Sequence, residues 1–182
     1  MRIAAFVLEL IFQWLVGAAL LRAWMNALRV NMRVQPGLFV MALTDWIVKP
    51  LRRWLPQPVA KARIDWGSVL SAVLLSILYA IAWRSLMGAW SLGLPWLGAV
   101  AGWPGMALIF LVRTAIQVLS VLLLGAVLVS WLQTGSPLHV MLSRLTAPWL
   151  APIRSLLPPI GGVDLSPMVL LLLLQVAAVL LG

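Results

Sequence analysis

Apolar residues gather in four long runs along the chain, and basic, proline-rich stretches separate them. The first three runs are long enough to cross a hydrocarbon core of about 30 Å as helices, and the fourth is marginal. Glu9 and Gln13 interrupt the first run, which we therefore interpret as a retained span and not as a cleaved signal peptide. The pattern predicts an all-α membrane protein with four transmembrane helices: Ile3–Trp24, Trp66–Met87, Met106–Trp131 and Pro167–Leu181.

Composition supports this prediction, because 64% of the residues are hydrophobic, only 9% are charged, and the mean hydropathy is +1.08. A soluble domain of this size could not cover such a sequence with polar surface. The net charge is +9, from 13 Lys and Arg against 4 Asp and Glu. Because the basic residues flank apolar runs, we expect partners among anionic lipid headgroups and not among nucleic acids.

Basic residues also predict orientation. Two connections carry them, whereas the connection between the second and third runs is uncharged and rich in Trp, Gly and Pro. The positive-inside rule then places both basic connections in the cytoplasm and both termini in the periplasm of a bacterial inner membrane. The residues that set this orientation are Arg22, Arg29, Arg33, Lys49, Arg52, Arg53, Lys61 and Arg63 after the first run, and Arg144 and Arg154 after the third.

The two halves of the chain repeat the same order of features. TDWIVKPLRRWLP (Thr44–Pro56) aligns with TAPWLAPIRSLLP (Thr146–Pro158), and an Asp that opens the next span follows each. With two spans per unit, both units insert in the same direction, as a parallel repeat. We expect one repeat over residues 1–90, a neutral outer loop over 91–105, and the second repeat over 106–182. The aligned pairs are Thr44 with Thr146, Pro50 with Pro152, Arg52 with Arg154, Pro56 with Pro158, and Asp65 with Asp164.

The second unit resembles a known family. PIRSLLPPIGGVDLSPMVLLLL (Pro152–Leu174) is similar to the signature of the YggT family, also called YlmG, and LLRAWMNAL (Leu20–Leu28) looks like the equivalent motif of that family's first unit. The first unit departs from the signature, because it has no Gly-Gly pair before Asp65 and no Ser-Pro pair after Trp66. The resemblance implies a bacterial inner-membrane protein with related forms in plastids, and it implies no particular enzyme activity. It also implies associations with osmotic-stress tolerance, envelope and division-gene neighbourhoods, and cytochrome-complex maturation in plastids.

Each connector is predicted to contain a short amphipathic helix that lies in the membrane interface. Its apolar stripe is opposite the charged residues, and Pro50 and Pro152 fit best in a first helical turn. Gly161 and Gly162 then allow a sharp turn, while Ser166 and Pro167 are typical of a helix cap and first helical position. One interpretation is a plain interfacial turn; the other is that ion pairs close each connector. The residues of this motif are Pro50, Arg52, Arg53, Pro56, Asp65, Pro152, Arg154, Pro158, Gly161, Gly162, Asp164, Ser166 and Pro167.

Among the polar residues within the predicted spans, four are candidates for a function: Glu9, Gln13, Arg113 and Gln117. Ionisable groups at membrane depth require partners, and Glu9 and Arg113 fall at similar depths. We expect either an ion pair between these two or separate contacts with the outer interface. A polar path for ions is a third interpretation.

The sequence offers little for catalysis. His139 is the only histidine, cysteine is absent, and the four acidic residues are scattered. We therefore expect no enzyme activity, no cofactor and no metal site. The predicted function is an accessory or scaffold role in membrane or envelope homeostasis, including osmotic stress, with a membrane-protein partner or a second copy of the chain. The alternative is a small oligomeric channel or transport subunit for ions.

Overall fold

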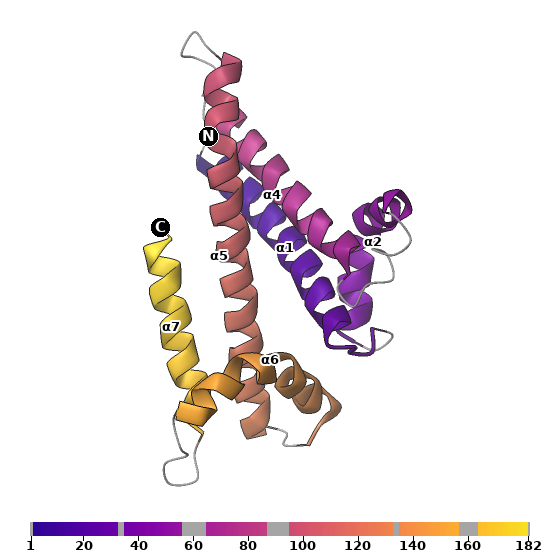
Figure 1. The fold of residues 1–182 in the computed structure, drawn as a ribbon, viewed down its shortest axis with the longest axis vertical. Coiled ribbons are helices and arrows are strands. Elements are labelled where there is room, and N and C mark those ends of the chain that lie inside the picture. Colours follow the sequence, from indigo (N-terminus) through magenta and orange to yellow (C-terminus); the bar gives the residue numbers. More distant parts are fainter. Residues whose placement is uncertain are drawn as a thin grey trace. The chain divides into compact units, whose positions relative to one another are not determined.

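The computed structural model describes residues 2–32, 35–55, 65–86, 95–132, 135–156 and 164–181, with side chains in the fourth range from residue 102. Within these ranges the chain forms six helices and no strand, which confirms the predicted all-helical class. The elements are drawn in Figure 1: α1 (Arg2–Ala27), α2 (Gly37–Trp54), α4 (Trp66–Leu86), α5 (Pro95–Leu132), α6 (Pro137–Leu156) and α7 (Ser166–Leu180).

Three stretches of helix are long and apolar enough to cross a membrane: Arg2–Ala27, Trp66–Leu86 and Gly102–Leu132. The fourth predicted span corresponds to α7, which has 15 residues. At the rise of an α-helix this is about 22 Å, which is shorter than a hydrocarbon core of about 30 Å. Apolar length alone therefore establishes three candidate spans and one shorter apolar helix.

Helix α5 begins earlier than the sequence suggested. Residues from Pro95 onward are helical, although we expected residues 91–105 to form a loop. Proline is well tolerated at the start of a helix, because the first N–H groups have no partner within the helix. Pro104 lies inside the helix, and residues 91–94 are outside the described ranges.

The chain divides into two compact units, residues 1–115 and 116–182, and α5 supplies residues to both. In unit 1, α1 and α4 lie side by side (Figure 1), and α2 packs against both. Small residues line this contact, which lets helix backbones approach closely. They include Gly17, Ala19 and Ala23 of α1 and Gly67, Ser68, Ser71, Ala72 and Ser76 of α4, all buried.

An aromatic group joins α1, α4 and the first part of α5 within unit 1. The ring of Tyr79 stacks on Phe110 with centroids 3.8 Å apart, and its centroid is 5.9 Å from that of Phe12. In unit 2, a second core forms around Leu119, Leu123, Leu150 and Leu170, from α5, α6 and α7. Each unit thus buries its own apolar cluster.

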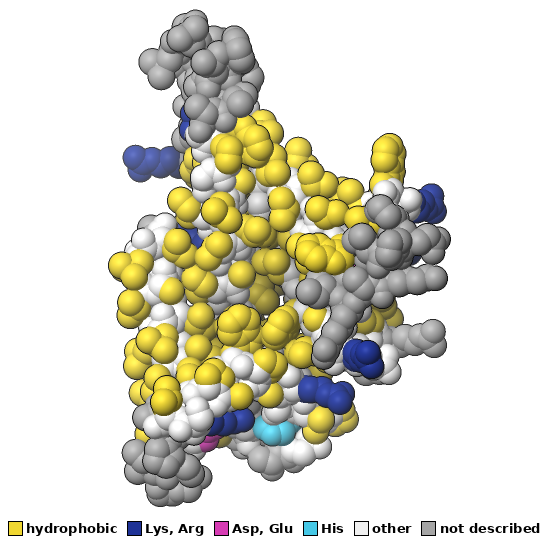
Figure 2. Space-filling model, viewed as in Figure 1, with side chains coloured by type: hydrophobic (Ala, Val, Ile, Leu, Met, Phe, Trp, Pro, Cys, Tyr) yellow, Lys and Arg dark blue, Asp and Glu magenta, His cyan; other side chains and the backbone are white. Residues whose placement is uncertain are grey.

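Many large apolar side chains remain on the surface. Phe6 and Trp14 of α1 are each 64% exposed, and Leu173 of α7 is 57% exposed. Hydrophobic side chains also dominate the face shown in Figure 2. Exposed apolar helices of this kind are consistent with a membrane protein, in which lipid covers these side chains.

The two amphipathic helices are longer than predicted, and their prolines are not in the first turn. Pro50 lies near the end of the 18-residue helix α2, and Pro148 and Pro152 lie inside the 20-residue helix α6. The prediction was wrong because the residues upstream also carry a buried face, which includes Val40 and Thr44 in α2. Packing of this face extends the helix towards its N-terminus, and the exposed position of each proline makes the missing hydrogen bond tolerable.

Candidate functional site

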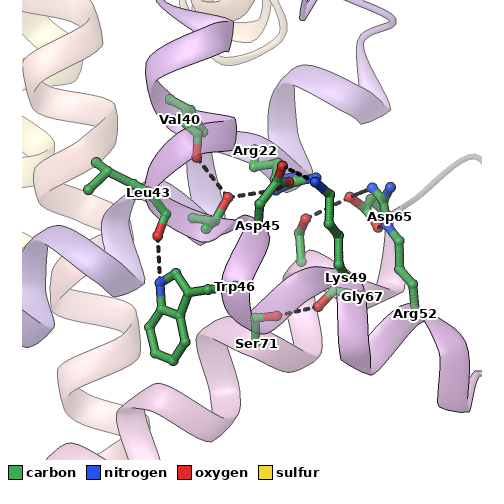
Figure 3. Close-up of polar contacts among 12 residues, drawn as sticks. Arg22, Val40, Leu43, Asp45, Trp46, Lys49, Arg52, Asp65, Gly67 and Ser71 are labelled. Carbon is green, nitrogen blue, oxygen red and sulfur yellow. Dashed lines mark hydrogen bonds and ion pairs between the residues drawn. The ribbon is translucent and has the colours of Figure 1, made fainter.

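Polar side chains from three helices meet in unit 1, where α1 ends, α2 packs across it and α4 begins (Figure 3). We call this group the unit 1 polar cluster. It contains four cations or amides and four acidic or hydroxyl side chains: Arg22, Asn26, Lys49 and Arg52, with Thr44, Asp45, Asp65 and Ser68.

Arg22 is at the centre of the first half of the cluster. It is only 3% exposed, and its Nη1 donates to Thr44 Oγ1 at 2.7 Å and to Asp45 Oδ1 at 2.8 Å. The other oxygen of Asp45 contacts Lys49 Nζ at 2.7 Å, so one carboxylate holds two cations. A buried guanidinium is stable only with such a counter-ion. Arg22 therefore fastens the end of α1 to the middle of α2.

Thr44 connects this half to the backbone of its own helix. Its hydroxyl accepts the hydrogen bond from Arg22 and donates to the carbonyl of Val40 at 2.7 Å. Both hydrogen-bonding functions of a fully buried hydroxyl are thus satisfied, as burial requires. In unit 2, Thr146 makes the matching bond to the carbonyl of Leu142 at 2.9 Å.

Asp65 organises the second half. Arg52 grips its carboxylate with two nitrogens, Nε at 3.1 Å from Oδ1 and Nη2 against Oδ2. Asn26 Nδ2 and Ser68 Oγ donate to Oδ2 at 2.8 and 2.6 Å. Asp65 therefore joins the end of α1, the end of α2 and the first turn of α4.

Asp65 also occupies the start of α4. Its backbone carbonyl accepts from the N–H groups of Ser68 and Val69, at 3.0 and 3.1 Å. A carboxylate at this position is favoured by the positive end of the helix dipole. Gly67 makes room for Arg52 here, because a Cβ on Gly67 would lie 2.6 Å from Arg52 Cγ.

The surroundings of these acids keep them ionised. Burial alone would raise the pKa of Asp65, but hydrogen bonds from Arg52, Ser68 and Asn26 outweigh burial and lower it. The hydrogen bond from Lys49 is the largest influence on Asp45 and lowers its pKa, against desolvation and together with Arg22. Both acids thus remain charged partners at neutral pH.

Unit 2 contains a simpler version of the same junction. Arg154 Nε and Nη2 each lie 2.8 Å from Asp164 Oδ2, and the backbone N–H of Ser166 donates to Asp164 Oδ1 at 2.9 Å. Burial opposes ionisation of Asp164, yet the bonds from Ser166 and Arg154 lower its pKa. The side chains of Arg154 and Asp164 are 51% and 40% exposed, against 42% and 9% for Arg52 and Asp65.

The cap of α7 differs from the prediction. Ser166 is the first residue of the helix and makes no side-chain cap hydrogen bond; Asp164 instead accepts the N–H of Ser166. An Asp side chain commonly bonds to the backbone N–H two residues further on, and here this contact takes the place of the cap predicted for Ser166. Pro167 is the second residue of the helix, one position later than predicted but still in the first turn.

Both ion pairs between Arg and Asp that the sequence suggested are present, Arg52 with Asp65 and Arg154 with Asp164. Arg53 lies next to Arg52 but forms no ion pair with any described residue. The described ranges do not include Pro56, Pro158, Gly161 or Gly162.

The predicted pair of Glu9 and Arg113 remains a prediction. In unit 1 Glu9 is half-buried, and Arg113 is exposed. Gln13 and Gln117 are also half-buried, and His139 lies in the first turn of α6, where its N–H bonds to Ser136 Oγ at 3.1 Å.

Six residues of the cluster were missed as site residues: Arg22, Asn26, Thr44, Asp45, Lys49 and Ser68. Arg22 and Asn26 lie four residues apart in LLRAWMNAL, a spacing that puts both on one helix face. This spacing was visible in the sequence. However, an Arg at the end of an apolar run is also typical of the ordinary basic flank of a span. In unit 2 the positions equivalent to Arg22 and Asp45 are Val129 and Ala147, so the repeat offered no second copy of this contact.

The cluster contains little that is free to react. Its carboxylates are already bonded to Arg, Lys, Asn and Ser side chains. In the described part of the chain, no group of three or more His, Cys, Asp or Glu is placed to hold a metal ion. The geometry is that of a joint between helices.

Comparison with known proteins identifies a family for this chain. The model of the CCB3/YggT family matches residues 1–86 and 105–182, which are the two halves that carry the junctions. The uncharacterized protein YggT of Escherichia coli K12 is 35% identical over 177 residues, covering 97% of this chain and 87% of that protein.

Two further relatives are similar to this chain over most of its length. An uncharacterized protein of Vibrio alginolyticus, encoded in a proC 3' region, is 31% identical over 179 residues, which cover 98% of this chain and 92% of the relative. An uncharacterized protein of Haemophilus influenzae is 32% identical over 156 residues, 85% of this chain and 78% of the relative. No solved structure matches the chain.

Proposed function

The chain belongs to the CCB3/YggT family, and on this basis we propose that it is a non-enzymatic scaffold of the bacterial inner membrane with four spans in two parallel units. One observation carries the proposal. In both units an Arg near the end of the amphipathic helix grips the Asp that opens the next helix. The connectors are therefore braced elements, which suits a surface that presents fixed groups to lipid or to a partner protein.

The position of the junctions supports a place at the cytoplasmic surface. Each lies at the end of apolar helices, where charged side chains reach headgroups and water. The surrounding connectors contain most of the Lys and Arg residues of the chain, as the positive-inside rule expects for cytoplasmic segments. Counting α7 as the fourth span requires the bilayer to thin locally or flanking residues to extend the apolar length.

A role in membrane or envelope homeostasis, including osmotic stress, is part of the proposal. A bacterial strain that lacks its YggT relative provides the test, with growth after osmotic shock as the measurement. The wild-type chain should restore growth, and the double variant R52Q/R154Q should not, because both junctions lose their ion pair. Growth restored equally by the double variant would refute a function that depends on the braced connectors.

The matched control is Arg144→Gln. Arg144 lies exposed on α6, the same helix as Arg154, and forms no ion pair with any described residue. It should restore growth as well as the wild type. Immunoblots of the membrane fraction establish that all variants accumulate equally.

A second candidate is an ion channel or transport subunit, favoured by the position of two ionisable residues, Glu9 and Arg113, within candidate spans. Ionisable residues within spans often line transport paths. Ion flux through purified protein in liposomes, lost in Glu9→Ala, would support this function over the scaffold. Absence of flux together with a co-purifying membrane protein would support the scaffold.

A further inference from the structure

Helix α2 has three distinct faces. The first packs into unit 1 through Gly37, Val40, Thr44 and Val48, all buried. The second carries Asp45 and Arg52, which take part in the polar cluster. The third face has no partner among the described residues, and its composition indicates what covers it.

Aromatic side chains occupy one side of this third face. Phe39 is 55% exposed, Trp46 61% and Trp54 88%. Trp46 and Trp54 are eight residues apart in a helix, so their rings follow one stripe. The indole N–H of Trp46 donates to the carbonyl of Leu43 at 2.8 Å, which holds the ring against the helix. Exposed tryptophans on an amphipathic helix are typical of insertion among lipid headgroups.

Cations run beside this stripe. Lys49 and Arg53 are four residues apart, hence one above the other on the helix surface. Lys49 contacts Asp45 but its side chain is 66% exposed, and Arg53 is exposed and unpaired among the described residues. Four cations, Arg22, Lys49, Arg52 and Arg53, face only two acids here, Asp45 and Asp65, so an excess positive charge points outward.

Unit 2 shows that a connector can form without the aromatic and basic residues of this third face. The repeat keeps Thr146, Pro152 and Arg154, and Arg154 pairs with Asp164 before the start of α7. The outward residues are replaced: Lys49 by Ala151, Arg53 by Ser155, Trp46 by Pro148 and Trp54 by Leu156. The exposed tryptophans and Arg53 of α2 are therefore not required to form a connector, and Lys49 contacts Asp45 while its side chain stays 66% exposed.

We propose that this face of α2 is a binding site for anionic phospholipid, which unit 2 lacks. Lys49 and Arg53 hold the headgroup phosphate, while Trp46 and Trp54 lie between the neighbouring lipids. This inference rests on the proposed position of the connectors at the membrane surface. Each cation near an anionic surface strengthens attachment about fivefold. Guanidinium and ammonium groups both suit phosphate oxygens.

Native mass spectrometry of the full chain in detergent tests the site, with phosphatidylglycerol against phosphatidylcholine as the probes. The wild type should retain phosphatidylglycerol preferentially. The variant K49A/R53S, which copies the residues of unit 2, should bind it about tenfold more weakly or worse, as expected when two cations near an anionic surface are lost. Arg144→Ala on α6 is the control and should keep the preference. An unchanged preference in K49A/R53S would overturn the proposal.

A gain of function provides the converse. Ala151→Lys with Ser155→Arg transfers the cations to α6 and should add a second phosphatidylglycerol to the complex. Failure of this graft, with the protein folded as judged by thermal unfolding, would show that the two cations are insufficient and would count against the assignment.

A spin label on α2 distinguishes the proposed lipid site from the proposed position of the connectors at the membrane surface, on which the site depends. The chain has no cysteine, so Ala42→Cys on the exposed side of α2 gives a single labelling site. In vesicles of phosphatidylcholine alone, and of equal parts phosphatidylcholine and phosphatidylglycerol, the label should lie at interfacial depth. A label in bulk water in both would refute the surface position and the site together. An interfacial label without lipid preference in the spectrometry would refute the lipid site alone.

Discussion

Asp65 and Asp164 lie just before α4 and α7, the second apolar helix of each repeat, and their surroundings set how firmly each connector is held. Asp65 receives bonds from Arg52, Asn26 and Ser68, whereas among the described residues Asp164 receives them from Arg154 and Ser166. The aligned sequences were sufficient to suggest both ion pairs, because the order of Arg and Asp is repeated. They did not reveal Asn26 or the buried Arg22, because single polar residues at the end of an apolar run also occur as ordinary flanks.

Acid should weaken the unit 1 junction through Asp65. Its pKa is lowered on folding, from a usual value near 3.9, so the stabilisation is complete above that value and is lost as the pH falls through the folded value. The unfolding temperature in detergent should be steady from neutral pH to about pH 5 and should drop below about pH 4. In Asp65→Asn the protein should be less stable at neutral pH, with a shallower acid decline. An identical acid decline in both proteins would contradict the role of Asp65.

A side chain at Gly67 should disturb the same junction. The Cβ would lie 2.6 Å from Arg52 Cγ, so Arg52 must move and its grip on Asp65 is lost. We expect Gly67→Ala to cost about 1 kcal/mol, or about 2–4 °C in unfolding temperature. Gly105→Ala is the control, because nothing lies within 4 Å of the position that a Cβ would take there and alanine is the better helix former. Equal stability of the two variants would show that Arg52 adapts without loss.

At the scale of elements, the periodicity of the sequence located the helices well and their ends poorly. The four apolar runs correspond to α1, α4, α5 and α7, but α2, α5 and α6 all begin before the predicted position. Proline misled the prediction, since Pro50 and Pro152 were assigned to first turns and instead lie inside helices. Tertiary burial of Val40, Thr44 and Leu142 decided the outcome, and a single sequence does not show which faces find a partner.

The two junctions should couple their helices with different strength. Double-mutant cycles with Arg52→Gln and Asp65→Asn, and with Arg154→Gln and Asp164→Asn, measure each pair, and Asn preserves a capping oxygen. The largely buried Asp65 should give a coupling of about 1.5–3 kcal/mol, the range of hydrogen bonds to charged groups. The more exposed pair of unit 2 should give about 0.2–1 kcal/mol.

Thermal or denaturant unfolding in detergent reports both cycles. A coupling in unit 2 equal to or greater than that in unit 1 would contradict the view that α2 is the more firmly held connector. The control variants are Lys49→Ala and Arg53→Ser. They remove neighbouring charges of α2 and leave the pair of Arg52 and Asp65 in place.

At the scale of the whole chain, composition and apolar periodicity were enough to predict an all-helical protein. The signature in the second unit predicted membership of the YggT family, which the family match confirms. The number of spans is harder, because α7 has 15 residues and lies at the limit of what crosses a bilayer. The direction of insertion was predicted from the distribution of Lys and Arg along the sequence. Contacts between the described helices do not bear on it. Topology is thus the point at which the proposed architecture is most open to a direct test.

Sided labelling of single cysteines is that test, and the cysteine-free chain requires no background substitutions. Ala42→Cys on α2 and Ala151→Cys on α6 are exposed positions in the two connectors, and a third cysteine is appended to the C-terminus. With an impermeant maleimide on intact spheroplasts, both connector sites should stay unlabelled until the membrane is opened, while the C-terminal cysteine should react at once. Labelling of one connector but not the other, or a C-terminus protected like the connectors, would contradict four spans in two parallel units.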